Sequence, residues 1–128
     1  MSLLKMIKFL NIVKVGYKCR KKIINIKKQF LPISLLLFFY KKGIIEGWSY
    51  KEINEIEIKL RYIKNKPIFN NLKIISTPGY RRYISKKKNI KYFKDNVDII
   101  LSTSKGLLSL KEAEDIGIGG EIFFIIYY

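Results

Sequence analysis

At 128 residues the chain is long enough for one domain or for two small lobes that share a core, and its apolar content of 48% argues against disorder. Its 26 lysines and arginines outnumber its 10 acids, and the net charge of +16 favours a polyanionic partner, either nucleic acid or an anionic membrane. The chain has no histidine and one cysteine, Cys19, so it lacks the usual general base near pH 7 and any intrachain disulfide. Metal-ligand spacings are also missing, and we expect neither a cofactor nor catalysis.

The first 45 residues contain eleven lysines and arginines and no acid, a charge that phosphate groups would neutralise with release of counterions. Apolar residues at helical spacing predict a helix from Leu3 to about Val13, which Gly16 ends. The run 22–28 alternates as a short strand, and a second helix is predicted between Pro32 and Gly43. The apolar run from Phe30 to Tyr40 is about half the length needed to span a bilayer, so we expect a buried helix.

The middle of the chain predicts two strands, over 44–49 and 53–63. Ile56, Ile58 and Leu60 alternate with charged residues in the second of them, a pattern typical of a half-buried strand. The sequence Asn65-Lys66-Pro67 then interrupts the pattern and is our predicted lobe boundary. We therefore expect an N-terminal α-β-α-β-β lobe over residues 1–66.

The second lobe, residues 67–128, is predicted to be mostly β with one short helix, which makes the whole chain an α+β protein. Strands are expected over 72–75, 80–84, 97–101 and 122–128, with a turn at 76–79 and a basic loop over 85–91. Ser109 and Glu112 have the spacing of a capping box, and Gly117 is the expected end of the helix that they begin.

The turn Ser102-Thr103-Ser104-Lys105-Gly106 is the strongest functional signal, and we expect it to connect a strand to the short helix. The order of its residues is wrong for a Walker phosphate-binding loop, and the glycines at 117, 119 and 120 lack the dinucleotide-binding spacing. Short hydroxyl side chains, a lysine and a glycine suit contacts with phosphate, with the ribose 2′-hydroxyl or with an exposed base edge. From the pattern alone, an ordinary turn without a ligand remains an equal alternative.

The run ILSTSKGLLSLKEAEDIGIGGEIFF, which begins at Ile100, resembles the C-terminal signature of the small ribosomal subunit protein eight family. The resemblance holds at every glycine, at the three hydroxyls of the turn, and at Glu112, Ala113 and Glu121. A second block, from Ser76 to Tyr83, and a third, Lys42-Gly43-Ile44-Ile45, resemble the family in the same order. The likeness covers nearly the whole chain from about Leu3, although Glu114 replaces a basic residue of the family pattern.

The resemblance implies a two-lobe α+β protein that binds small-subunit rRNA in its central domain, beside neighbouring small-subunit ribosomal proteins. It implies that the C-terminal lobe recognises the RNA, with no membrane and no small-molecule substrate involved. For Tyr83, core packing is an equal alternative to RNA contact, and Lys27, Lys28 and Arg20 are predicted phosphate contacts from charge alone. The other predicted RNA-binding residues come from the matched signature: Ser102, Thr103, Ser104, Lys105, Gly106, Gly119, Gly120 and Glu121.

Residue usage rich in Ile, Lys, Asn, Tyr and Phe indicates A/T-rich codons, so we expect an organellar ribosome, mitochondrial in the first place and plastid as the alternative. Two rival functions remain open at this point. A basic peripheral membrane protein would use the N-terminal helix and the apolar run that follows. A small nucleotide-dependent enzyme is disfavoured by the missing histidine and by the order of the turn residues.

Overall fold

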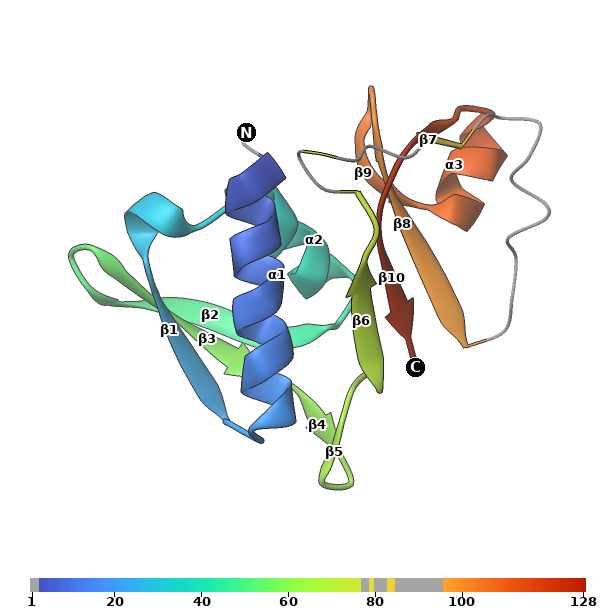
Figure 1. Ribbon diagram of the computed structural model, residues 1–128. Coiled ribbons are helices and arrows are strands. Elements are labelled where there is room, and N and C mark those ends of the chain that lie inside the picture. The colour runs from blue at the N-terminus through green and yellow to red at the C-terminus, as the bar shows by residue number, and fades with distance from the viewer. Residues whose placement is uncertain (1–2, 77–78, 80–82, 85–95) are drawn as a thin grey trace. The chain divides into compact units, whose positions relative to one another are not determined.

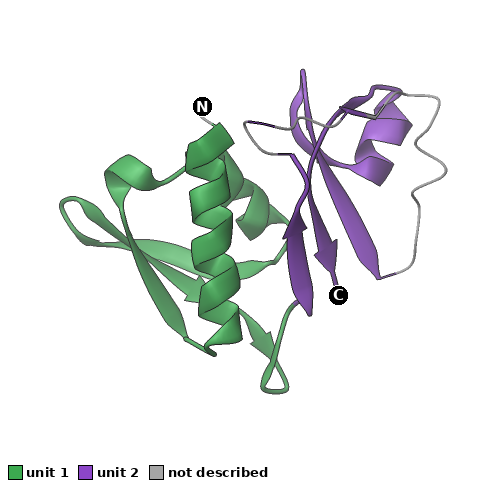
Figure 2. Ribbon diagram, viewed as in Figure 1, with its two compact units in different colours: residues 1–68 green, residues 69–128 purple. Residues whose placement is uncertain are grey.

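The computed structural model describes residues 3–76, 79, 83–84 and 96–128 (Figure 1). They form two compact units, Met1–Ile68 and Phe69–Tyr128 (Figure 2), which we call unit 1 and unit 2. The predictions for Thr77-Pro78, for Tyr80–Arg82 and for the basic loop over 85–91 lie outside the described residues.

Unit 1 has the predicted α+β composition, with two helices on one face of a three-stranded antiparallel sheet of order β1-β3-β2 (Figure 1). The rings of Phe9 and Phe39 meet at 5.8 Å between the helices, and the isoleucines of β1 and β3 that face them are buried. The elements are α1 (Leu3–Lys18), β1 (Ile23–Lys27), the 3-10 turn η1 (Lys28–Phe30), α2 (Ile33–Lys41), β2 (Ile45–Glu52), β3 (Glu55–Leu60), β4 (Tyr62–Ile63) and β5 (Lys66–Pro67).

The prediction that Gly16 ends the first helix is wrong, because α1 continues to Lys18. Gly16 is buried, and a Cβ there would lie 2.8 Å from a methyl group of Ile24, so this glycine permits close packing of α1 on the sheet. Arg20 adopts the left-handed conformation that ends the helix, with φ of 55°, and the Lys21 N–H donates to the Gly16 carbonyl over 3.0 Å. The second helix does end as predicted, before Gly43 with φ of 74°.

The predicted strand over 53–63 is divided in the structure into β3 and β4. β2 continues to Glu52, and the turn after it leaves the Ile53 side chain 91% exposed. β4 pairs with β5 in a small hairpin whose two turn residues, Lys64 and Asn65, both have positive φ, the geometry of a type I′ turn.

The Tyr17 hydroxyl connects three segments of unit 1. It donates a hydrogen bond to the Ile44 carbonyl, just before β2, and accepts one of 2.9 Å from the Arg61 N–H, just after β3. The ring is 3% exposed and packs against the Tyr62 ring at 5.5 Å between centroids. Burial raises the pKa of Tyr17 to about 12, although the Arg61 N–H partly opposes that shift.

Unit 2 is built on an antiparallel sheet in which β10 is central. β8 pairs with one edge of β10, and β6 and β7 pair with different parts of the other edge, while β9 extends the sheet beyond β8. The elements are β6 (Asn71–Ile74), β7 (Tyr83–Ile84), β8 (Val97–Thr103), β9 (Gly106–Ser109), α3 (Leu110–Ile116) and β10 (Gly120–Tyr127).

The short helix of unit 2 has both of its predicted ends. The Ser109 hydroxyl accepts from the Glu112 N–H at 3.3 Å, and the Glu112 carboxylate accepts from the Ser109 N–H at 3.3 Å, which completes the capping box. Gly117 ends α3 with φ of 85°. Ala113 of the helix is buried against Ile99 and Leu101 of β8, so the cap fixes α3 on one face of the sheet.

Candidate nucleic-acid interface

The hydroxyl-rich turn is the tip of a β-hairpin between β8 and β9. The expectation that it leads from a strand into the helix is wrong, because β9 intervenes and pairs with β8 from Gly106 to Ser109. Ser104 and Lys105 form the two-residue tip, and both are exposed. A hairpin tip presents side chains and backbone amides to solvent together, so this geometry suits contact with a shaped polar surface.

Thr103 stabilises the hairpin tip from within. Its hydroxyl donates to the Gly106 carbonyl over 2.8 Å and accepts from the Lys105 N–H over 3.1 Å. Gly106 has φ of 98°, a conformation that residues with a Cβ rarely adopt. The Thr103 hydroxyl is therefore engaged in the turn itself, whereas the Ser104 hydroxyl has no hydrogen-bond partner among the described residues.

Three predicted residues from separate segments lie in one row across the sheet. Glu121 of β10 is paired with Ser102 of β8 on one side and with Tyr83 of β7 on the other. Directly opposed residues in a sheet present their side chains on the same face, and alternation places this row on the face away from Leu101 and α3. Glu121, in the middle of this row, is only 6% exposed, so its side chain is buried.

Gly120 brings β10 into close contact with the base of the hairpin. A Cβ on Gly120 would lie 2.6 Å from the Ser102 carbonyl oxygen and 2.9 Å from the Thr103 methyl carbon. The absence of a side chain is thus what allows the two strands to approach at this point. Gly119 precedes it and is half-buried, in the connection between α3 and β10.

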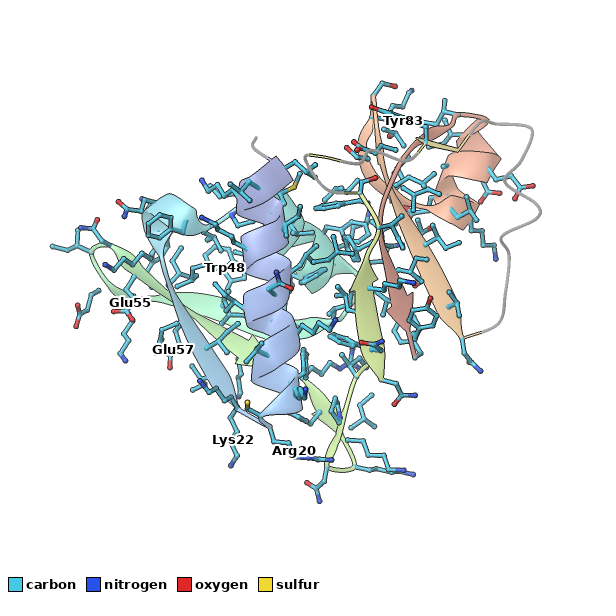
Figure 3. All side chains as sticks on the ribbon, in the orientation of Figure 1. Arg20, Lys22, Trp48, Glu55, Glu57 and Tyr83 are labelled. Carbon is cyan, nitrogen blue, oxygen red and sulfur yellow. The ribbon has the colours of Figure 1, made fainter. Side chains whose placement is uncertain are left out.

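Tyr83 is 70% exposed (Figure 3), which contradicts the alternative that its ring is a core residue. Its position opposite Glu121 places it in the row that begins next to the hairpin. An exposed tyrosine ring offers a flat apolar face on which an unstacked base can lie.

The predicted phosphate contacts of unit 1 do not form one cluster. Arg20 lies before β1 (Figure 3) and donates to the Asn65 carbonyl over 2.5 Å, whereas Lys27 and Lys28 lie at the other end of the strand. All three side chains are exposed. They offer separate points of positive charge rather than a single anion-binding pocket.

An aromatic cluster near Lys28 was missed by the sequence reasoning. The rings of Trp48 and Tyr50 meet edge to face at 5.9 Å, and the Lys28 ammonium lies 5.9 Å from the centroid of the Tyr50 ring. The alternation of Trp48 and Tyr50 in β2 did not reveal this exposed cluster, because the two residues are paired with the buried Ile58 and Ile56 and lie on the same face of the sheet as those core residues. Aromatic and cationic groups together are suited to contact with bases and phosphates.

Among the described residues, no cluster of three or more potential metal ligands occurs. The described helices also include none that is long and apolar enough to cross a membrane.

Comparison with known proteins agrees with the motif resemblance along the chain. Residues 5–127 match the family model of Ribosomal protein S8. The small ribosomal subunit protein uS8m of Acanthamoeba castellanii is 44% identical over 114 residues, which cover 88% of this chain and 90% of that protein. The uS8 protein of Ehrlichia ruminantium is 31% identical over 118 residues, 89% of each chain, and that of Citrifermentans bemidjiense is 35% identical over 109 residues, 81% and 82% of the two chains.

The match covers almost the whole chain and nearly the whole length of a mitochondrial and of bacterial relatives. Both the motif order and the α+β fold agree with it. The chain therefore belongs to the ribosomal protein S8 family, in its bacterial and organellar form, and is a structural ribosomal protein rather than an enzyme.

Proposed function

We propose that the protein binds small-subunit rRNA directly, in the central domain of that RNA, and helps the small ribosomal subunit to assemble. The observation that carries this proposal is the exposed Ser104-Lys105 hairpin tip, which adjoins a strand row ending in the exposed ring of Tyr83. In a chain of net charge +16, such a surface is suited to RNA far better than to a neutral partner.

Recognition in this proposal is by shape and by hydroxyl contacts. The wide, shallow minor groove of RNA presents 2′-hydroxyls and base edges, and the Ser104 hydroxyl and the turn amides can hydrogen-bond to both. Lys105 adds a charge contact with phosphate, and Tyr83 stacks on an exposed base. Ser102, Gly119, Gly120 and Glu121 hold the base of the hairpin, and Thr103 and Gly106 set the shape of its tip.

Unit 1 supplies most of the electrostatic attraction. It carries 16 of the 26 lysines and arginines and only four of the ten acids. Phosphate neutralisation by Arg20, Lys27 and Lys28 strengthens binding to any RNA and makes affinity fall steeply with salt. Unit 2 then provides the selectivity. In this proposal, phosphate contacts of unit 1 attract any RNA, and the contacts of unit 2 select the specific one.

We assign the protein to the mitochondrial ribosome, with neighbouring small-subunit ribosomal proteins as its other partners. The A/T-rich residue usage supports an organellar ribosome, and the likeness to the uS8m protein of Acanthamoeba castellanii supports the mitochondrial one. An epitope-tagged copy that sediments with small subunits from purified mitochondria, and not from plastids, is the expected result.

Replacing Ser104 by alanine should weaken specific binding by about 1–3 kcal/mol, because a hydrogen bond at the RNA surface is lost while its partner stays buried. The measurement is a filter-binding titration against the central domain of small-subunit rRNA, with an unrelated structured RNA as competitor. Ser49→Ala is the matched control, since Ser49 is an exposed serine of β2 in unit 1. Equal affinities for Ser104→Ala, Ser102→Ala and the wild type would refute the role of the hairpin.

Replacing Lys27 or Lys28 by glutamine should reduce affinity for specific and competitor RNA alike. The logarithm of the binding constant falls as the logarithm of the salt concentration rises, and each lost phosphate contact makes this slope shallower by about one. Titrations at several salt concentrations measure that slope. A variant that loses only specific binding, with an unchanged salt dependence, would mean that the lysine reads a particular RNA feature instead.

A further inference from the structure

The side of unit 1 between α1 and β1 has a groove, of whose lining residues the RNA-binding proposal uses only Lys27. Two hollows, of about 600 and 540 Å³, lie along it and share Ile12 and Asn25 in their linings. The first is floored by Phe9 and Ile26, and the second by Gly16 and Ile24. Because they share these residues, the hollows adjoin between the helix and the strand, and we call the two together the groove.

The groove concentrates exposed apolar side chains. Five large apolar side chains line the two hollows and are between 38% and 54% exposed, in a unit that carries 16 lysines and arginines. Covering such surface is favourable, at about 25 cal/mol for each Å² removed from water. The residues are Leu4, Ile12, Val15, Ile23 and Phe30.

Among the described residues, β1, the strand beside the groove, pairs along one edge only. β1 lies at the end of the order β1-β3-β2. The Lys22 carbonyl accepts from the Leu60 N–H over 2.9 Å, and the Lys28 N–H donates to the Asn54 carbonyl over 2.8 Å. The backbone N–H and C=O groups of the even-numbered residues in this segment therefore point toward β3. Antiparallel alternation then directs the backbone groups of Ile23, Asn25 and Lys27 outward, where a further strand can pair with them.

Charge identifies the kind of strand that fits. Lys5, Lys8 and Lys27 line the first hollow and Lys21 lines the second, and the residues lining both hollows include no acid. A second copy of β1 would place lysine opposite lysine, which protects the edge from self-pairing. An RNA strand has no peptide groups to continue the ladder and no alternating apolar side chains to fill the groove.

We propose that the free edge of β1 and the groove beside α1 dock an extended segment of a partner protein, in which apolar residues alternate with acidic ones. The segment adds a strand to β1, its apolar side chains enter the groove around Ile12, and its carboxylates face the lysines. All of the residues involved belong to unit 1, so the proposal does not depend on recognition of RNA by the hairpin of unit 2.

The test uses the full chain and a fluorescein-labelled peptide of nine residues in which glutamate alternates with isoleucine or valine. Fluorescence anisotropy should show that the alternating peptide binds. A peptide of the same composition in scrambled order should bind about tenfold or more weakly than the alternating peptide. Hydrogen exchange should show new protection at the amides of Ile23, Asn25 and Lys27 when the alternating peptide is present. Equal affinity for the scrambled peptide, or no added protection, would overturn the proposal.

Two variants separate docking from general attraction of an acidic peptide to a basic protein. Ile12→Glu places a carboxylate at the centre of the groove and should weaken binding by about tenfold or more. Leu37→Glu makes the same charge change at a side chain of α2 that is 51% exposed and lines neither hollow, so it should leave the affinity nearly unchanged. Equal losses in both variants, or displacement of the peptide by RNA with no effect of Ile12→Glu, would contradict docking in the groove.

Discussion

Replacing Gly120 by alanine should lower the free energy of unfolding by about 2–3 kcal/mol, the upper part of the usual range for overpacking. The added Cβ would lie 2.6 Å from the Ser102 carbonyl oxygen, a distance that real Cβ contacts essentially never show. The obstructing atom is backbone, so a change of rotamer cannot relieve the clash. β10 and β8 must separate, and both are strands of the sheet that carries the hairpin.

Urea denaturation followed by far-ultraviolet circular dichroism measures this loss. Gly47→Ala is the matched control, because a Cβ on that glycine of β2 would meet no heavy atom within 4 Å. The control should be neutral or slightly stabilising, since alanine also restricts the unfolded chain. If both variants had the wild-type stability, the close approach of β10 to the hairpin base would be wrong.

The same variant should weaken RNA binding even where the protein remains folded. Ser102 and Thr103 move with β8 when that strand is displaced, and Thr103 holds the hairpin tip through its bonds to Gly106 and Lys105. Binding and stability therefore change together for Gly120→Ala, whereas Ser104→Ala should affect binding alone. This contrast separates residues that shape the surface from a residue that contacts the ligand.

Local sequence signals predicted the elements whose cause is local. The capping box of Ser109 and Glu112 depends on residues three positions apart, and the alternation in β3 depends on neighbours two positions apart. β9 was missed because four residues, two of them consecutive leucines, show no alternation. The end of α1 was misplaced because Arg20, rather than a glycine, takes the left-handed conformation.

The candidate site depended on contacts that no local pattern contains. The resemblance to a known family indicated Gly120 and Glu121, but only the fold shows that Gly120 abuts Ser102 and that Glu121 lies between Ser102 and Tyr83. Tyr83 is ambiguous in sequence, since an aromatic residue in a strand suits a core as well as a surface. Its exposure follows from the position of β7 on β10, which is a long-range property.

Tyr17→Phe should lower the free energy of unfolding by about 2–4 kcal/mol, because each buried polar group left without its partner costs about 1–3 kcal/mol. Phenylalanine preserves the ring packing but leaves the Ile44 carbonyl without its donor and the Arg61 N–H without its acceptor. These bonds join residues 27 and 44 positions apart, so their loss loosens the connection of α1 to the open end of the β2-β3 hairpin. Thermal and urea denaturation measure the change.

Tyr62→Phe is the matched control for that variant. The Tyr62 hydroxyl donates to the Lys21 carbonyl over 2.6 Å at an exposed position, where water can replace it, so its removal should cost less than about 1 kcal/mol. The two tyrosines are in ring contact, which keeps the surroundings of the two substitutions alike. Equal costs for both variants would show that the buried bonds of Tyr17 have no special weight.

Alkaline pH provides an independent test of the buried Tyr17 hydroxyl. Burial raises its pKa from 10.0 to about 12, so the folded protein retains this proton at a pH where the unfolded chain releases it. The contribution of the protonated Tyr17 hydroxyl to the free energy of unfolding is fully present below pH 10.0 and is lost as the pH rises through about 12. Burial also raises the pKa of Tyr128, but that contribution is common to the wild type and the variant. The stability difference between wild type and Tyr17→Phe should therefore shrink over this interval, and a difference that stays constant would mean that the hydroxyl titrates as it does in water.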